Sequence, residues 1–171
     1  NPEFAGMTYV NGYDDPPIIA GAGTMGAEIL EQLPQTDYVI IPTGGAGLIA
    51  GASLAIKTLA SHVKVIGVEP EVCPSMQAAL KAGEPVSITA GATLADGLAV
   101  PKVGTHAFLV ARKYTDRFVS VSESEVALAV LRLVETEKMV VEGGGASGLA
   151  AILPGGPLHE EVQGKNVVIP L

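Results

Sequence analysis

The sequence has little cysteine, few aromatic residues and little charge, and each shortage excludes a class of protein. The single cysteine, Cys73, cannot form an internal disulfide bond, which favours a reducing compartment and predicts a cytoplasmic protein. Aromatic residues make up 4% of the chain and tryptophan is absent, so stacking platforms for single-stranded nucleic acid are not expected. No apolar run reaches the roughly 18 residues that a membrane helix needs, so no membrane partner is predicted.

The charge that is present is mostly negative. Ten basic and 18 acidic residues give a net charge of −8, which repels phosphate backbones and argues against a nucleic-acid partner. Apolar residues make up 48% of the 171 positions. A chain of this length and composition can bury a sizeable core in one domain.

Strand-like runs alternate with helical patterns along most of the chain. Short, nearly continuous apolar runs predict strands at residues 38–42, 63–68, 117–121 and 166–170. Helical patterns cover residues 47–59, 74–82, 105–115, 123–137 and 146–153. Ser122 and Glu125 form a capping box before the fourth of these helices. The alternation predicts an α/β fold, an open, mostly parallel twisted sheet with helices on both faces.

The two ends of the chain suggest an incomplete domain. Residues 1–6 are expected to be foreign residues added ahead of it. Residues 7–171 then form a partial domain that is truncated at both ends, because the chain stops at Leu171 on a predicted strand of the sheet.

The strongest local pattern is the glycine-rich stretch from Pro42 to Leu48, which follows a predicted strand and opens a helix. Glycines there let backbone N–H groups converge at a helix N-terminus, where partial positive charge favours an anion, most naturally a phosphate. A tight strand-to-helix turn without a ligand is the alternative. A P-loop is excluded, since no Lys-Ser/Thr pair follows the glycines.

A second glycine pattern, Gly21 to Gly26, matches G-x-G-x-x-G and raises the alternative of a nucleotide-binding Rossmann-type domain. The acidic residue that such a domain carries about 20 residues further on is missing, because Thr43 stands there.

Two carboxylates stand near predicted sheet or helix ends. Glu142 precedes three glycines, and Glu69 ends a strand at its carboxyl edge, where sites in parallel sheets lie. A helix-dipole role for Glu142 and a solvated loop position for Glu69 are the alternatives.

Seven segments in this order resemble threonine/serine dehydratases and serine racemases. The segments are Tyr13 to Pro16, Ile19 to Thr24, Glu28 to Gln32, Gly44 to Leu48, Gly67 to Pro70, Leu94 to Gly97 and Glu142 to Gly148. The resemblance covers nearly all of the chain from Met7 to Leu171. It implies the large domain of a fold type II pyridoxal-phosphate (PLP) enzyme.

The resemblance also implies a set of cofactor-binding residues. The backbone of Gly44, Gly45, Ala46, Gly47 and Leu48 would hold the cofactor phosphate, Gly97 would approach the cofactor closely, Glu142 would lie near its ring, and Tyr13 would line the pocket. Ala46 stands where the family usually has glycine, and a negative φ would accommodate its methyl group.

A metal site is also implied by some relatives, which bind a divalent cation at positions that correspond to Glu69, the carbonyl of Cys73, and Ser75. Serine is a poorer ligand for a hard cation than the aspartate of those relatives, which puts a divalent cation in doubt here.

The family's Schiff-base lysine belongs to a Ser-Phe-Lys-x-Arg-Gly-Ala motif, and no lysine of this chain stands in that context. No catalytic residue is therefore assigned. The resemblance implies a PLP-dependent lyase that converts L-threonine or L-serine to a 2-oxo acid and ammonia, a homodimer as the complete enzyme and inactive as this chain alone. A racemase of the same fold, a nucleotide-binding domain and a non-catalytic structural fragment remain open alternatives.

Overall fold

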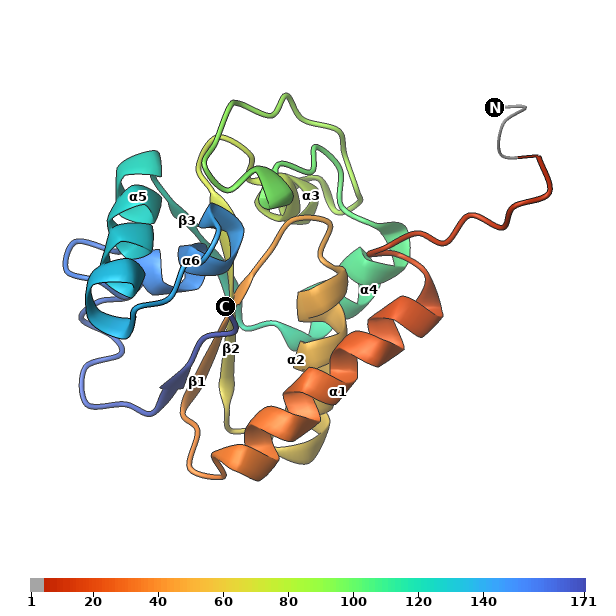
Figure 1. Cartoon of the computed structure of the whole chain (residues 1–171). Coiled ribbons are helices and arrows are strands. Elements are labelled where there is room, and N and C mark those ends of the chain that lie inside the picture. The colour runs from red at the N-terminus through yellow and green to blue at the C-terminus, as the bar shows by residue number, and fades with distance from the viewer. Residues whose placement is uncertain (1–4) are drawn as a thin grey trace.

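The fold is a four-stranded parallel sheet between two layers of helices, as the computed structural model shows for residues 5–171 (Figure 1). The strands are β1 (Tyr38–Pro42), β2 (Lys64–Pro70), β3 (Arg117–Val121) and β4 (Val167–Val168), in the spatial order β3-β2-β1-β4. All three pairings are parallel, with Tyr38 opposite both Lys64 and Val167. The predicted open parallel sheet is confirmed.

Residues 5–171 also form seven helices of four residues or more and one 3-10 turn. They are α1 (Pro16–Gln32), α2 (Gly47–Leu59), α3 (Ser75–Ala82), the 3-10 turn η2 (Asp96–Leu98), α4 (Thr105–Tyr114), α5 (Glu123–Arg132), its π-helical continuation η3 (Leu133–Glu137) and α6 (Gly143–Ala150). Within the described part of the chain, no helix is long and apolar enough to cross a membrane.

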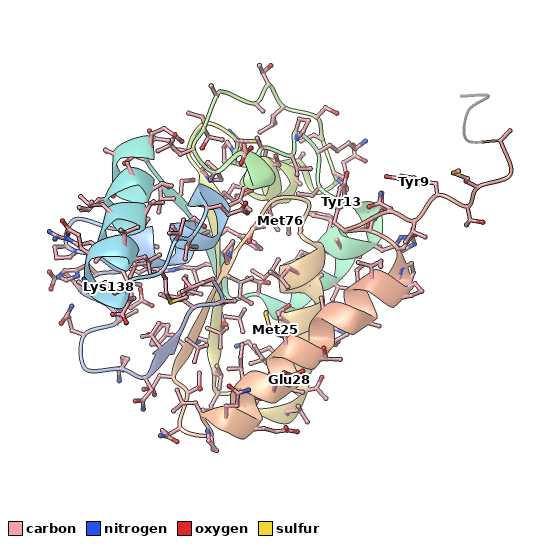
Figure 2. All side chains as sticks on the ribbon, viewed as in Figure 1. Tyr9, Tyr13, Met25, Glu28, Met76 and Lys138 are labelled. Carbon is pink, nitrogen blue, oxygen red and sulfur yellow. The ribbon has the colours of Figure 1, made fainter. Side chains whose placement is uncertain are left out.

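Two apolar cores lie on the two faces of the sheet, because successive side chains of a strand point to opposite faces. Val39 and Ile41 of β1 face a core shared with α1, α2, α3 and α4, whereas Ile40 faces a core shared with α5 and α6. Met25 of α1 packs against the first core, and Glu28, one turn further, is exposed (Figure 2). Helices therefore cover both faces, as predicted.

The nucleotide-binding alternative is wrong, because Gly21 to Gly26 lies inside α1 and forms no phosphate-binding turn. The sequence pattern does not predict this helix, since glycine weakens a helix interior. The structure explains Gly23 and Gly26 by close packing on α2. A Cβ added at Gly26 would lie 2.7 Å from the carbonyl oxygen of Ala52, and one at Gly51 would lie 2.0 Å from that of Ile19.

Several predicted boundaries shift. The helix predicted at residues 146–153 is α6, which begins at Gly143, so the three glycines before it form its first turn. The helix predicted at 123–137 is α-helical only to Arg132 and continues as a π-helical turn. The strand predicted at 166–170 pairs only over Val167–Val168. β2 runs on to Pro70, so Glu69 belongs to the strand.

We expect Gly51→Ala to destabilise the protein by about 3 kcal/mol, because the new methyl group would collide with backbone at the α1–α2 crossing. Gly21→Ala is the matched control, since a Cβ there meets nothing within 4 Å. An alanine in an exposed helix position should stabilise by up to ~1 kcal/mol. Urea unfolding of both variants measures the difference, and equal stabilities would contradict the proposed crossing.

Candidate cofactor site

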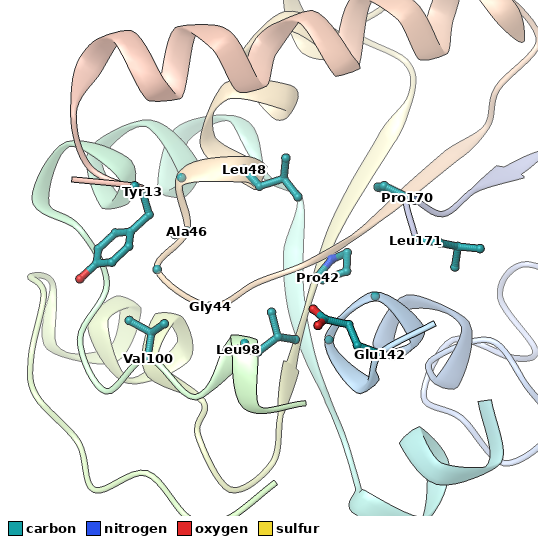
Figure 3. Close-up of a pocket in the computed structure, with 16 residues that line it drawn as sticks. Tyr13, Pro42, Gly44, Ala46, Leu48, Leu98, Val100, Glu142, Pro170 and Leu171 are labelled. Atoms are coloured by element: carbon teal, nitrogen blue, oxygen red, sulfur yellow. The ribbon is translucent and has the colours of Figure 1, made fainter. Parts of the chain in front are cut away.

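The candidate site is an open cavity of about 420 Å³ at the carboxyl edge of the sheet. Pro42 at the end of β1, and Pro170 and Leu171 just beyond β4, line it (Figure 3). From β1 the chain proceeds through β2 to β3 on one side, while β4 lies on the other side of β1. Ligands of open α/β sheets bind at such a reversal of strand order, outside the carboxyl ends of the strands.

The structure brings all eight predicted cofactor-binding residues to this one cavity. Its lining includes Tyr13, Gly44, Gly45, Ala46, Gly47, Leu48, Gly97 and Glu142. The remaining lining residues were not predicted to bind the cofactor, although Pro42, Gly144 and Gly145 belong to the glycine-rich motifs. They are Gly12, Pro42, Leu98, Val100, Gly144, Gly145, Pro170 and Leu171. Neighbours of predicted residues, such as Leu98 beside Gly97, could have been included from adjacency alone.

The loop from Gly44 to Ala46 and the first turn of α2 present unpaired backbone donors. Thr43 N donates to the carbonyl oxygen of Val68 at 2.8 Å, and Ala50 N donates to that of Ala46 at 3.0 Å. Between them, at residues 44–49, no backbone N–H donates to a protein acceptor anywhere in the described chain. Unpaired N–H groups at a helix N-terminus can donate hydrogen bonds to an anion such as phosphate, and the helix dipole favours its negative charge.

Ala46 adopts a left-handed conformation, with φ 72° and ψ 3°. The expectation that a negative φ accommodates its methyl group is therefore wrong. A left-handed residue next to right-handed ones turns successive N–H groups toward one point, which suits anion binding. For alanine this conformation costs roughly 1–2 kcal/mol. The methyl group is 2% exposed, and its burial in the first core offsets part of that cost.

The glycines on either side of Ala46 have no positive φ, so an unusual backbone angle does not explain them. They are explained by the close approach of Tyr13. The ring of Tyr13 lies directly on Gly45, where an added Cβ would be 2.3 Å from Cγ. The backbone of Tyr13 lies on Gly47, where a Cβ would be 2.3 Å from the Tyr13 carbonyl oxygen. Any side chain at these two positions would displace Tyr13 from the cavity wall.

Hydrogen bonds fix the segment that carries Tyr13. Asn11 Oδ1 accepts from the N–H groups of Tyr13 and Asp14, each at 3.0 Å. The Asp14 carboxylate in turn accepts from Thr105 N at 2.9 Å and Ala107 N at 3.0 Å. Both N–H groups belong to the first turn of α4, where they have no partner within the helix. Asp14 therefore caps α4, although it lies about 90 residues away in the sequence. The cap ties the turn before α1 to α4.

Glu142 is the residue that precedes α6, and its exposed carboxylate lines the cavity near Gly97 and Gly144. A Cβ added at Gly97 would lie 3.4 Å from Glu142 Oε1, and one at Gly144 would lie 3.2 Å from it. The glycines after Glu142 allow close packing of α6. A Cβ on Gly143 would lie 2.3 Å from the carbonyl oxygen of Leu94.

The three residues of the implied metal site lie close in the fold but already have protein partners. Both oxygens of Glu69 accept hydrogen bonds from the N-terminal part of α3, Oε1 from Met76 N at 2.6 Å and Oε2 from Gln77 N at 3.2 Å. Ser75 Oγ donates to the carbonyl oxygen of Val100, and the carbonyl oxygen of Cys73 accepts from Ser75 N at 3.0 Å. Within residues 5–171, no group of three or more His, Cys, Asp or Glu side chains could hold a metal ion.

Burial raises the pKa of Glu69 from an ordinary value of 4.5 to about 7, although the hydrogen bonds from Met76 and Gln77 oppose that rise. The carboxylate is fully buried in β2. The interpretation of Glu69 as a solvated loop carboxylate is therefore wrong, and its hydrogen bonds hold the start of α3 to the end of β2.

The cavity and its donor-rich loop define an α/β protein that can bind a phosphorylated ligand at the switch point of its sheet. A family model described as "Pyridoxal-phosphate dependent enzyme" matches residues 3–171. The chain belongs to this family.

Individual relatives agree with that assignment. L-threonine ammonia-lyase of Thermotoga maritima is 47% identical over 98% of this chain and 41% of its own length. The catabolic L-threonine dehydratase of Escherichia coli is 40% identical over 97% of this chain and 50% of its own length. The chain thus spans half or less of the curated relatives that it matches.

Solved structures show the same fold. The processed form of threonine deaminase isoform 2 from Solanum lycopersicum matches with a TM-score of 0.90 and 34% identity, over 97% of this chain and 48% of that one. Maize serine racemase matches with a TM-score of 0.83 and 32% identity, over 88% of this chain and 46% of that one.

The residues of the cavity fit PLP, the cofactor of the family. The unpaired N–H groups at residues 44–49 suit a phosphate, and three glycines leave room for it to approach the backbone. A cavity of about 420 Å³ lies in the range of small-molecule sites, roughly 300–1,000 Å³. None of the residues that line it is a lysine.

Proposed function

We propose that this chain is the phosphate-binding part of a PLP-dependent L-threonine/L-serine dehydratase that releases a 2-oxo acid and ammonia. The observation that carries the proposal is the convergence of eight predicted residues from four separate segments on one cavity beside unpaired N–H groups. The names of the most similar relatives, threonine ammonia-lyases and dehydratases, support the lyase over other members of the family.

In this proposal the chain supplies binding and orientation. The N–H groups of Gly44 to Leu48 hold the phosphate, Tyr13 closes one end of the cavity, and Gly97 and Glu142 flank the ring. When bound, the cofactor acts as an electron sink for the carbanion that forms after loss of the substrate α-proton. The lysine that would carry the cofactor and act on that proton is not among the cavity residues.

A serine racemase is the second candidate, since maize serine racemase shares the fold at 32% identity. Racemisation uses the same carbanion but needs a second base on the opposite face of the substrate. The decisive experiment incubates the complete polypeptide that contains this sequence with L-threonine and with L-serine. We expect a 2-oxo acid and ammonia in equal amounts. Formation of D-serine without 2-oxo acid would favour the racemase. The absence of both products would refute both candidate functions.

We expect no 2-oxo acid from the 171-residue chain alone. Loss of the nucleophilic lysine removes many orders of magnitude of rate, because the groups of such a site act as a unit. Coupled detection of 2-oxo acid from L-threonine at increasing protein concentration measures this. Turnover proportional to the amount of this chain would show that the catalytic group is present in it.

Divalent cations are expected to affect the complete enzyme weakly. Ser75 contributes no charge, and its hydroxyl already donates to Val100, while charge and ligand count set most of the affinity of a hard-cation site. Thermal unfolding with Mg²⁺ or Ca²⁺ and with EDTA tests this expectation. A stabilisation at micromolar cation that Glu69→Gln abolishes would contradict it.

We also propose that the complete enzyme is a homodimer that acts on a small amino acid.

A further inference from the structure

One wall of the cavity is an irregular segment, residues 96–100, here called the distal wall. It contributes Gly97, Leu98 and Val100 to the lining and faces the Gly44–Leu48 loop (Figure 3). The two are in direct contact, since a Cβ on Gly44 would lie 3.1 Å from Leu98 Cα. A segment with little regular structure needs anchors elsewhere in the fold to keep one conformation.

The first anchor is the carboxylate of Glu123, in the first turn of α5. Its Oε1 accepts a hydrogen bond from Thr93 Oγ1 at 2.5 Å, and its Oε2 accepts one from Leu94 N at 2.8 Å. Thr93 Oγ1 accepts in turn from Ala95 N at 3.0 Å, and Ala95 is fully buried. Glu123 therefore holds the three residues that lead directly into the distal wall.

The second anchor lies at the other end of the distal wall. The carbonyl oxygen of Val100 accepts from Ser75 Oγ, and Cys73 Sγ approaches the same oxygen at 3.5 Å. Ser75 and Cys73 are both about 1% exposed. Side chains from two different connections of the sheet thus fix the two ends of the wall, while none of them lines the cavity.

We infer that Glu123 and Thr93 are positioning residues for the cofactor, acting through the distal wall without touching the ligand. The inference rests on the proposed function. Hydrogen bonds to a carboxylate are among the stronger ones in proteins, so this pair preorganises the wall that the cofactor ring would contact. Without them the wall must be ordered on binding, which lowers affinity. The phosphate loop touches the distal wall at Gly44 but forms no hydrogen bond with Glu123 or Thr93, so its N–H groups should stay in place when these side chains are removed.

The test measures two ligands on the complete apoenzyme, from which the cofactor has been removed. Fluorescence titration gives the dissociation constant of PLP, and competition with PLP gives that of inorganic phosphate. For Glu123→Ala we expect PLP to bind ~10-fold more weakly, which corresponds to about 1.4 kcal/mol. Phosphate affinity should stay within about twofold, because phosphate needs only the Gly44–Leu48 loop. The matched control is Glu137→Ala, which removes the same charge at an exposed position.

Two further variants keep the test decisive if Glu123→Ala folds poorly. Thr93→Val removes one hydroxyl at constant shape and should weaken PLP by ~3-fold, and Glu123→Gln, which keeps one acceptor, should lie closer to the wild type. Unchanged PLP affinity in Glu123→Ala and Thr93→Val would overturn the inference. An equal loss of PLP and phosphate affinity would also overturn it, in favour of a general structural role. A wild-type enzyme that binds neither ligand would refute the proposed cofactor site itself.

Discussion

Gly45→Ala is expected to weaken PLP binding to the complete enzyme by ~100-fold or more, because the added methyl group would collide with Tyr13 in the cavity wall. The added Cβ would lie 2.3 Å from Cγ and 2.5 Å from Cδ2 of Tyr13, a separation that the two residues cannot keep. Because Cγ is near the root of the Tyr13 side chain, the ring must leave the cavity wall or the loop must move. Either change disturbs the converging N–H groups on which phosphate binding depends.

The double variant Gly45→Ala/Tyr13→Ala separates those two causes. Removal of the ring leaves space for the new methyl group, so phosphate affinity should return toward that of Tyr13→Ala alone. Gly21→Ala, remote from the cavity, serves as the control for glycine substitution. Equal phosphate affinity in wild type and Gly45→Ala would show that the loop does not bind the phosphate.

Stability should fall by about 3 kcal/mol between pH 4.5 and pH 7 because of one residue, Glu69. Its pKa is raised by burial from 4.5 to about 7, so between these values the folded protein binds a proton that the unfolded chain releases. The stabilising contribution is therefore fully present below pH 4.5 and is lost as pH rises through about 7. Each pKa unit corresponds to about 1.4 kcal/mol, which sets the magnitude.

Urea unfolding of wild type and Glu69→Gln in EDTA, from pH 4.5 to pH 8, isolates this contribution. Glutamine cannot ionise, so the difference in unfolding free energy between the two proteins should change by about 3 kcal/mol across that interval. Other groups titrate in both proteins and cancel. Glu71→Gln, an exposed neighbour, is the control. A difference that does not vary with pH, or that varies in the opposite direction, would mean that Glu69 is ionised in the fold without cost.

The sequence pattern located the candidate site better than it located some of the helices. The order of strand, glycine-rich turn and helix at Tyr38 to Leu59 is local, and β1 and α2 form with the predicted boundaries. By contrast α1 was not predicted, because Gly21, Gly23 and Gly26 oppose a helix when only local propensity is considered. Contacts with α2, about 28 residues further on, explain two of these glycines: a Cβ on Gly23 would lie 3.3 Å from the Gly51 carbonyl oxygen, and one on Gly26 would lie 2.7 Å from that of Ala52.

The reason for each glycine in the cavity also required the fold. The loop sequence predicted that its glycines let backbone N–H groups converge, yet the one left-handed residue there is Ala46. Gly45 and Gly47 are needed because Tyr13 lies against them, and Tyr13 is held there by Asn11 and by the cap that Asp14 provides to α4. No spacing in the sequence indicates that residue 14 caps a helix beginning at residue 105.

The sequence by itself determined the parallel α/β class, the family and the residues that meet at the cavity, since these depend on local apolar runs, turn chemistry and short motifs in a fixed order. Only the tertiary structure decided that Glu69 is buried with a raised pKa, that Ala46 is left-handed, and that Glu123 accepts a hydrogen bond from Thr93, 30 residues away. The physical reason is that burial, steric contact and hydrogen bonding between distant segments arise from their arrangement in space. Local sequence propensity does not depend on contacts between distant segments, so it cannot predict them.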